Sequence, residues 1–405
     1  MHLYSSEATL LIHSQTTGRV ILMGKHLIAA ILLTCSLTLV NSTQTAAQVG
    51  IFDAGTTTQF IDIGINPVSN DIVLVGSESI GGTETASVYN LSADRSSFSR
   101  DTLVGLGLGT TVSGISPDGF RIAGTSQVTA DRSEGTTWIS SAANSPTGIG
   151  LIPSDGFFFG PGNSSSGVAA WNGGIVGEIA GGPYIPENGA YRWEPNQISS
   201  ISTVLEGRVN GVSGDGRLVI ANDSYVGGVV FGLSGSQTFS GSSFESISPN
   251  GSFIGGFDFD FNAQLWTEDI VTGEFVATSI LRQNESTDAL ETVVGSVADA
   301  SDSGYAVINT SDGVLIWNES FNGIDSEFTG AQYFDEWILA LGGVELSAQV
   351  TDIVGVAEQD GVLHFAANST DRSFVVSVST VPEPSSAAVL LAAASIGVLQ
   401  RRRRR

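Results

Sequence analysis

Few residues outside the two ends of the chain could perform catalysis. Between residues 48 and 380, His364 is the only histidine, and there is no cysteine and no lysine. Serine and cysteine nucleophiles need a basic partner and Schiff bases need a lysine, so these mechanisms and His-rich metal sites are almost excluded. His364 lies in the strand-like run Val362–Phe365, which favours a structural or exposed role. No Gly-rich run carries the lysine of a phosphate-binding loop, which excludes nucleotide binding.

Carboxylates are the only abundant reactive groups. The chain has 41 Asp and Glu residues against 16 Lys and Arg, and its formal net charge is -25. Such a surface repels nucleic acid and anionic lipid, so we expect no nucleic-acid partner. Asp302-Ser303-Gly304 has the letters of an aspartic protease triplet, but it falls on a predicted turn. A hydrolase or lyase built from two separated carboxylates remains an alternative, without a pair that the sequence singles out.

One acidic segment could bind calcium. Residues 257–262 read Phe-Asp-Phe-Asp-Phe-Asn, an alternation that predicts a strand with Asp258, Asp260 and Asn262 on one face. Hard oxygen ligands of this kind suit Ca²⁺, the only cofactor that we consider. The spacing does not fit an EF-hand, because Ala263 stands where that loop needs glycine. We favour the simpler interpretation, a half-buried strand with a solvated acidic face.

The N-terminal 47 residues have the pattern of a signal peptide. Residues 25–26 are Lys-His, an almost unbroken apolar run covers residues 27–40, and small residues follow up to Ala47. This order of a charged start, an apolar core and a small-residue end predicts a signal helix cleaved between Ala47 and Gln48. The 22 residues before Met23 are long and polar for such a start. We therefore expect translation to begin at Met23.

The C-terminal segment, residues 381–405, contains three elements in a fixed order: a Pro-Glu-Pro motif, an apolar stretch and five arginines. The 13 apolar residues 387–399 predict a short transmembrane helix, of about 20 Å against a hydrocarbon core of about 30 Å. Five arginines resist translocation, so this end stays in the cytoplasm while the preceding residues lie outside. The prolines keep the adjacent peptide extended and open to a protease. The sorting motif is Val381, Pro382, Glu383 and Pro384; the membrane anchor includes Ala387, Leu390, Leu391, Ile396 and Leu399; the cytoplasmic anchor is Arg401, Arg402, Arg403, Arg404 and Arg405.

These three elements resemble the PEP-CTERM sorting signal, also known as the ice-binding protein C-terminal segment. The resemblance covers about 25 residues. It implies recognition by an exosortase-type membrane peptidase, cleavage near the motif, and transfer of the body to the cell surface or the extracellular matrix. A plain tail anchor is the alternative. The second name of the segment does not show that this body binds ice.

The body, residues 48–380, repeats a short unit. An apolar strand ends at a serine, a Pro-Asp-Gly or Gly-Asp-Gly turn reverses the chain, and a second strand follows. Proline presets φ, Asp or Asn bonds the local backbone, and glycine takes a positive φ. An aromatic residue follows 16 to 22 residues after the serine in another apolar run. The copies are 112–119, 209–216, 245–251 and 297–304, with a weaker one at 64–71; the aromatic residues are Tyr89, Trp138, Trp193, Phe231, Trp266 and Trp317.

The spacing of the copies predicts the fold. The turn serines Ser69, Ser116, Ser213, Ser248 and Ser301 are 47, 97, 35 and 53 residues apart, and 97 fits two units around a degenerate turn at 172–174. A unit of about 45 to 50 residues suits a four-stranded propeller blade. We therefore predict an all-β body, a β-propeller of about six or seven blades, with a last turn near 360–361 and a β-sandwich or jelly roll as the alternative. The pattern also resembles the extracellular HAF-type repeat.

The sequence thus predicts an exported cell-surface or matrix protein with a non-catalytic binding or structural body. We expect this body to contact extracellular polysaccharide through the propeller loops and cation bridges. A carbohydrate-active hydrolase or lyase is the second possibility, and an ice-binding adhesin, for which a regular Thr ladder is missing, is the third. Glycosylation is permitted at the Asn-x-Ser/Thr triplets of Asn90, Asn163, Asn222, Asn284, Asn309, Asn318 and Asn368.

Overall fold

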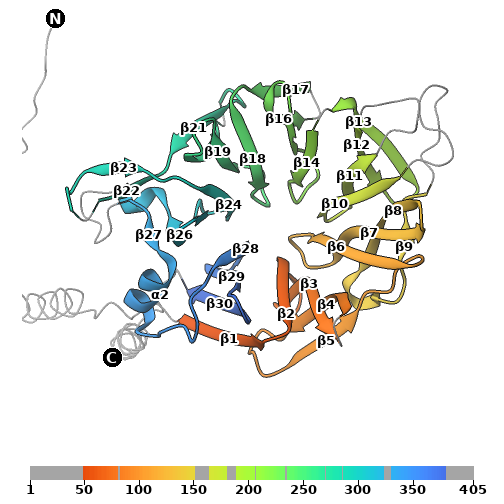
Figure 1. Cartoon of the computed structure of the whole chain (residues 1–405), viewed down its shortest axis with the longest axis horizontal. Helices are drawn as coiled ribbons and strands as arrows, with labels where there is room; N and C mark the ends of the chain where they lie inside the picture. Colours follow the sequence, from red (N-terminus) through yellow and green to blue (C-terminus); the bar gives the residue numbers. More distant parts are fainter. Residues whose placement is uncertain are drawn as a thin grey trace, which may run out of the picture. The chain divides into compact units, whose positions relative to one another are not determined.

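Seven four-stranded antiparallel sheets stand around a common axis (Figure 1). The computed structural model describes residues 49–80, 83–150, 164–179, 188–205, 207–232, 235–269, 271–284, 286–322 and 330–379. All of them belong to one compact unit, residues 47–381. The predicted β-propeller is therefore confirmed with seven blades, and the sandwich and jelly-roll alternatives are wrong.

Each blade is a meander whose first strand lies nearest the axis. Blade 1 contains β2 (Thr58–Ile65), β3 (Ile72–Ile80), β4 (Thr83–Leu91) and β5 (Phe98–Thr102). Blade 2 contains β6 (Gly109–Ile115), β7 (Arg121–Thr129), β8 (Arg132–Ile139) and β9 (Thr147–Gly148). Blade 3 contains β10 (Ser165–Trp171), β11 (Gly174–Ile179), β12 (Asn188–Glu194) and β13 (Gln197–Leu205). Blade 4 contains β14 (Gly207–Val212), β15 (Val219–Asp223), β16 (Gly227–Gly232) and β17 (Gly235–Phe239).

The remaining blades include the closure of the ring. Blade 5 contains β18 (Ser242–Ile247), β19 (Phe253–Asp258), β20 (Ala263–Glu268) and β21 (Phe275–Ser279). Blade 6 contains β24 (Ser296–Ala300), β25 (Ala306–Thr310), β26 (Gly313–Trp317) and β27 (Gln332–Tyr333). Blade 7 contains β28 (Asp352–Gln359), β29 (Val362–Asn368) and β30 (Ser373–Ser379), and β1 (Val49–Gly55) pairs with β30 as its outer strand. The first strand of the chain thus completes the last blade.

Among the described residues, two insertions interrupt the regular order of blades. The hairpin of β22 (Leu281–Gln283) and β23 (Leu290–Thr292) lies between blades 5 and 6, and α2 (Phe334–Gly342) lies between blades 6 and 7. Short 3-10 turns occur at Ser140–Ala142 and Glu319–Asn322. In a meander, successive turns lie at opposite ends of the sheet. The turns from the first to the second strand and from the third to the fourth strand therefore lie on the same face of the ring. We call it the cavity face, and the opposite side, with the second-to-third turns and the blade connections, the connection face.

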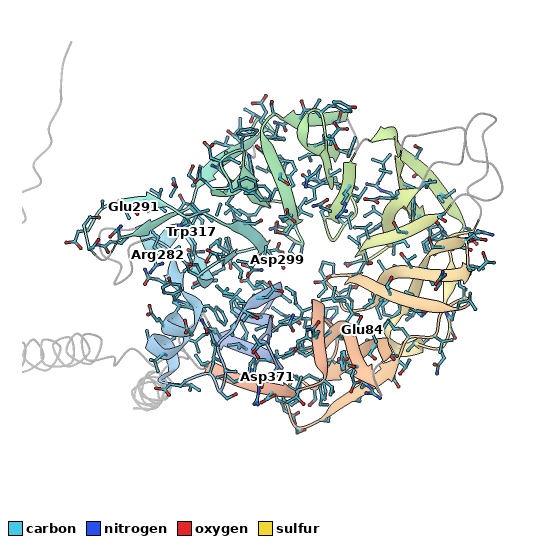
Figure 2. All side chains as sticks on the ribbon, in the orientation of Figure 1. Glu84, Arg282, Glu291, Asp299, Trp317 and Asp371 are labelled. Carbon is cyan, nitrogen blue, oxygen red and sulfur yellow. The ribbon has the colours of Figure 1, made fainter. Side chains whose placement is uncertain are left out.

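The core lies between neighbouring blades. The aromatic residues predicted from the repeat all fall on third strands, and Tyr89, Trp138 and Trp266 are buried there. The indole of Trp138 also donates to the carbonyl of Val104 at 2.8 Å. Each ring therefore contributes apolar burial, and the position that the repeat reserves for it is a packing position between blades. Trp317 occupies the same place in blade 6 (Figure 2).

The repeated serine turns connect first to second strands. Ser213 is fully buried, its hydroxyl donates to Asp215 at 2.7 Å, and it accepts the backbone N–H of Leu218 at 3.0 Å. Gly216 takes a φ of 72°, the left-handed region where a side chain would be strained. Ser116, Ser248 and Ser301 are buried in the same way. The turn mechanism read from the sequence is confirmed, as are the turns predicted at 172–174 and 360–361.

The turn serine predicted for blade 1, Ser69, is wrong. Ser69 is exposed, whereas Asn66 follows the end of β2 and accepts the N–H groups of Val68 and Ser69. Asn66 therefore takes the place that serine holds in the other copies. An asparagine side chain bonds the local backbone as a serine hydroxyl does, so the substitution preserves the turn.

Neighbouring blades are tied by asparagine side chains from second strands. The amide of Asn222 accepts the N–H of Phe244 at 2.7 Å and donates to its carbonyl at 2.9 Å. The amide of Asn368 does the same to Phe60, at 3.0 and 2.9 Å, and so joins blade 7 to blade 1. Asn309 holds Ile353 in the same manner. We call these three residues the inter-blade asparagines; because their amides are engaged, glycosylation at them is incompatible with this fold.

Candidate functional site: the axial cavity

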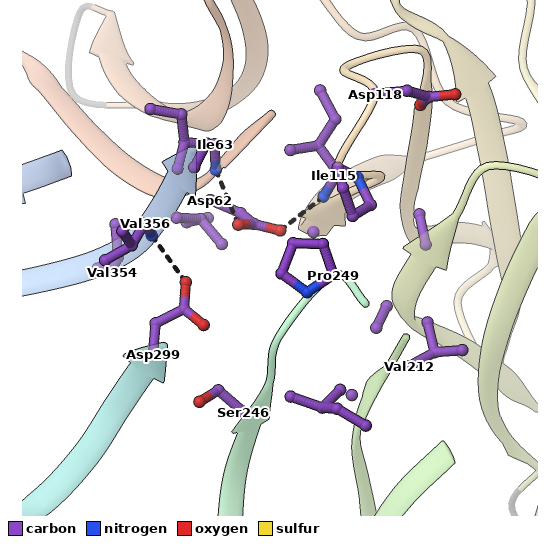
Figure 3. Close-up of a pocket in the computed structure, with 18 of the residues that line it drawn as sticks. Asp62, Ile63, Ile115, Asp118, Val212, Ser246, Pro249, Asp299, Val354 and Val356 are labelled. Atoms are coloured by element: carbon purple, nitrogen blue, oxygen red, sulfur yellow. Dashed lines mark hydrogen bonds between the residues drawn. The ribbon is translucent and has the colours of Figure 1, made fainter. Parts of the chain in front are cut away.

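A cavity of about 520 Å³ lies on the axis and extends to the cavity face. Its walls are the first strands of all seven blades, and its rim is formed by the turns that follow them (Figure 3). Turn prolines Pro67, Pro117 and Pro249 line this rim. The repeat unit found in the sequence therefore builds the wall and the rim of this cavity.

Every first strand carries a β-bulge at the same level. One extra residue interrupts the register between Phe60 and Asp62 in blade 1 and between Val297 and Asp299 in blade 6, and the other five blades repeat this. A bulge re-aims the side chain that follows it. The residues after the seven bulges are Asp62, Gly114, Ala169, Gly211, Ser246, Asp299 and Gly355. Five small residues and two aspartates thus form one ring around the axis.

The glycines of this ring make room for the carboxylate of Asp62. A Cβ atom on Gly114 would lie 3.2 Å from Asp62 Oδ2, and one on Gly355 would lie 3.1 Å from Asp62 Oδ1. Both distances are tighter than ordinary carbon–oxygen contacts, so larger residues would force the carboxylate to move. Asp62 therefore occupies a slot that its two neighbours keep open.

Asp62 and Asp299 are held by backbone amides of two blades each. Asp62 accepts the N–H of Ile63 at 2.7 Å and that of Ile115, from blade 2, at 2.8 Å. Asp299 accepts the N–H of Ala300 at 2.8 Å and that of Val356, from blade 7, at 2.7 Å. Figure 3 shows both carboxylates at the cavity wall. Each one links its own first strand to the first strand of the next blade.

Burial governs the protonation of this pair. Protein surrounds both carboxylates except on the side of the cavity, and the loss of hydration raises the pKa of Asp62 from 3.8 to about 7. The pKa of Asp299 rises equally, to about 7, first because of burial and further because of the negative charge of Asp62. The backbone amides oppose both shifts without cancelling them. The two groups therefore change charge near neutral pH.

All other ionisable residues on the cavity wall are acidic. Asp118, Glu245, Asp302 and Glu358 join the aspartate pair, and none of the described residues that line the cavity is basic. Burial also raises the pKa of Glu245 and of Asp302. A cavity of one charge sign repels anions and favours cationic or uncharged hydroxylic ligands. Within the described segments, no three His, Cys, Asp or Glu side chains converge so as to hold a metal ion.

The predicted calcium ligands lie elsewhere, on the connection face. The strand β19 ends at Asp258, and residues 259–262 form a turn, so the predicted single strand face is wrong. Asp258 Oδ1 accepts the N–H groups of Asp260 and Asn262, each at 2.9 Å. Its Oδ2 accepts the side-chain amides of Asn262 and Gln264, each at 3.1 Å. Asp258 thus organises the turn, and calcium binding by these residues stays a prediction.

His364 has the structural environment that its sequence position suggested. It lies on β29, and its Nδ1 is 2.8 Å from the hydroxyl of Ser377 on β30. Burial, together with the positive charge of Arg95, lowers the pKa of His364 from 6.5 to about 4. It is outside the axial cavity, and it is neutral in the folded protein at neutral pH.

The residues assigned to processing lie outside the described residues. These are the cleavage pair Ala47 and Gln48, the motif Val381–Pro384 and the anchor residues up to Arg405. Among the described residues we find no helix with the length and apolarity that a membrane span requires.

Sequence reasoning missed Asp62 and Asp299. A signal was present, because each stands as a single carboxylate inside an apolar first strand, in Phe-Ile-Asp-Ile (60–63) and Val-Ala-Asp-Ala (297–300). An acidic residue in such a run is either exposed or held by specific partners.

Comparison with known proteins finds distant likenesses in structure. No family model matches the chain, and no curated protein matches it. Similar solved structures include the β-propeller domain of Cps50 (Swd1) from Myceliophteria thermophila, at 8% identity, 83% coverage of this chain, 100% of that chain and a TM-score of 0.46. The propeller domain of the Trilobed protease from Pyrococcus furiosus shares 10% identity over 81% of this chain and 99% of that one, with a TM-score of 0.45.

An acylaminoacyl peptidase is a further similar structure, at 10% identity, 80% coverage of this chain and a TM-score of 0.43. This chain spans about half of its length, 51%. At such identities the peptidase names say nothing about catalysis in this protein.

Proposed function

We propose that this chain is an exported protein that an exosortase-type peptidase sorts to the cell surface or the extracellular matrix, where its propeller is a non-catalytic binding or structural body. The observation that carries the proposal is the order of Pro-Glu-Pro, apolar stretch and five arginines at the C-terminus, with a signal-like segment at the other end. The seven-bladed body between them is consistent with a binding role, because propellers present loops and an axial cavity rather than a fixed chemistry.

The sorting step can be tested by fractionation. In a host with an exosortase, the full chain should yield a surface product that begins at Gln48 and ends near residue 381. Replacing Pro382 and Glu383 by alanine should leave the C-terminal segment attached and hold the product in the membrane fraction. Glu274→Ala, on an exposed turn of blade 5, is the matched control and should be sorted normally. Recovery of an untrimmed cytosolic chain in the same host would refute the proposal.

The aspartate pair favours a second candidate, a carbohydrate-active hydrolase or lyase. A carboxyl group with a pKa near 7 can act as a general acid at neutral pH. Most glycoside hydrolases use a pair of Asp or Glu residues for catalysis. If the cavity is catalytic, the full chain should cleave at least one polysaccharide, and Asp62→Asn or Asp299→Asn should reduce the rate by about a hundredfold or more. Turnover that survives both substitutions, or no turnover on a broad panel, would leave the binding role in place.

A further inference from the structure

Large apolar side chains are exposed in a row on the connection face of blades 4 to 6. Tyr225 is 78% exposed, Phe259 83%, Phe261 63% and Val294 66%. Tyr225 lies in the turn between β15 and β16, the two phenylalanines lie in the turn between β19 and β20, and Val294 stands just before β24. On soluble proteins, exposed patches of apolar side chains mark binding surfaces.

These residues are neighbours in space. A Cβ on Gly227, beside the Tyr225 turn, would lie 3.1 Å from the amide of Gly241, and one on Gly241 would lie 3.7 Å from Phe259 Cβ. The carbonyl of Phe261 accepts the N–H of Gly295 at 2.9 Å. Asn262 forms an isolated β-bridge with Val294. The segments that carry these residues therefore follow one another from blade 4 across blade 5 to the start of blade 6. We call Tyr225, Phe259, Phe261 and Val294 the aromatic row.

The turn that carries the two phenylalanines is held in place by hydrogen bonds. The carboxylate of Asp258 binds the turn through four hydrogen bonds, and the Phe261 ring stacks on that of Phe257 at 5.4 Å and 18°. Phe261 adopts a φ of 61°. In this left-handed region a bulky residue is strained, whereas glycine and asparagine adopt it readily. Backbone geometry therefore does not explain this phenylalanine, whereas a use for its exposed ring does.

A cleft of about 630 Å³ continues the aromatic row between the β22–β23 hairpin and blade 6. It is lined by polar side chains, among them Arg282, Asn284, Glu291, Thr310 and Asp312. Figure 2 shows Arg282 and Glu291 on this hairpin, away from Asp299 at the axis. The guanidinium of Arg282 covers the ring of Tyr333 at 4.1 Å, and the amide of Asn284 donates to Glu291 at 3.0 Å. The cleft thus offers donors and acceptors at the Val294 end of the aromatic row.

We infer that the aromatic row and this cleft form a binding surface for an uncharged polysaccharide. Ring faces suit the C–H faces of pyranose units, and the polar side chains of the cleft suit their hydroxyl groups. The net charge of -25 disfavours anionic polymers. A lipid surface or a hydrophobic protein would need a continuous apolar patch, but Asp260 and Asn262 alternate with the phenylalanines. The inference rests on the proposed function and deepens it, because it names a ligand class for the binding body.

Native affinity electrophoresis can test this surface on the full chain in a polyoxyethylene detergent. The probes are four neutral polymers, laminarin, xyloglucan, hydroxyethyl cellulose and dextran, with alginate as the anionic comparison. At least one neutral polymer should retard the protein. Phe259→Ala combined with Phe261→Ala should weaken that retardation at least about tenfold. Val68→Ala combined with Val271→Ala is the matched control, since these side chains are 93% and 88% exposed on the cavity face, and it should change nothing.

A second variant separates binding from folding. Phe261→Asn should raise the melting temperature, because asparagine accepts the positive φ, yet it should weaken retardation as the alanine variant does. Retardation by alginate alone, by no polymer, or equally in all variants would overturn the inference. So would a dimer in sedimentation velocity that the phenylalanine variants abolish, since the row would then be an interface between two copies. The fractionation assay, run on the same variants, should show normal sorting, so a failure of sorting and a failure of sugar binding remain distinguishable.

Discussion

Replacing Asn368 by alanine is expected to lower the free energy of unfolding by about 2–5 kcal/mol. Asn368 satisfies both backbone groups of Phe60, which is 2% exposed, across the junction where the last blade meets the first. Alanine would leave a buried N–H and a buried carbonyl without partners, and each such group costs about 1–3 kcal/mol. The hydroxyl of Ser373, which lies 2.7 Å from Asn368 Oδ1 and 2.7 Å from the carbonyl of Thr58, would keep the carbonyl as its acceptor and so adds little to this cost.

Chemical denaturation of the full chain measures this effect against two references. Asn222→Ala removes the same pair of hydrogen bonds between blades 4 and 5 and should cost a similar amount. Asn90→Ala, on β4, removes a half-buried amide that ties no blade to its neighbour, and it should cost well under 1 kcal/mol. Asn368→Asp should be as damaging as alanine at neutral pH, because a carboxylate oxygen would then face the carbonyl of Phe60. A cost for Asn368→Ala no larger than that for Asn90→Ala would contradict this account.

The blades could be predicted because their signals are local. A turn of Ser-x-Asp-Gly type fixes where a first strand ends, and an aromatic residue at a set distance marks the third strand. The turn depends on a few adjacent residues and on the positive φ of one glycine, as at Gly216. The aromatic signal depends only on a distance along the chain. The copy at 64–71 was misplaced because Asn66 and Ser69 can both cap such a turn, and only the end of β2 decides between them.

The axial cavity could not be predicted because it depends on seven distant segments at once. A bulge adds one residue to a first strand without any fixed sequence, so the ring from Asp62 to Gly355 has no pattern along the chain. The inter-blade asparagines were visible only as Asn-x-Ser/Thr triplets. In the structure, their side-chain amides bond a backbone N–H and C=O of the next blade. Which strand lies next around the ring cannot be read from the triplet.

The Phe-Asp-Phe-Asp-Phe-Asn segment shows a different reason for error. Strict alternation is typical of a strand, but an aspartate that bonds the amides two and four residues later also spaces polar residues by two. The two arrangements have the same letters. In the structure the turn is formed, and two of the three phenylalanines that a strand would have half-buried, Phe259 and Phe261, are the most exposed phenylalanines of blade 5.

The stability of the full chain is expected to fall as pH rises from about 5 to 6.5. Asp62 and Asp299 have a pKa of about 7 in the folded state against an ordinary value of 3.8, so between these values the folded state binds more protons than the unfolded state. Each carboxyl group therefore removes up to about 1.4 kcal/mol per pH unit as pH increases, and the loss ends above its folded pKa. The pair interacts, so the two protons leave in steps that belong to both groups.

His364 acts in the opposite direction over the same range. Its pKa is lowered from 6.5 to about 4, so the unfolded state binds the extra proton and stability gains up to about 1.4 kcal/mol per pH unit as pH rises. With two carboxyl groups against one imidazole, the net slope from these residues remains negative. Burial also raises the pKa of Glu245 and Asp302, which adds to the fall.

Melting temperatures at half-unit steps of pH separate these contributions. Asp62→Asn combined with Asp299→Asn should flatten or reverse the slope between pH 5 and 6.5, and His364→Gln should make the wild-type slope steeper. The slope is the decisive quantity, because an asparagine amide cannot accept both N–H groups that each aspartate accepts, which lowers stability at every pH. A double variant with the same slope as the wild type would show that the two carboxyl groups are already ionised at pH 5, and that the axial cavity carries its full negative charge throughout.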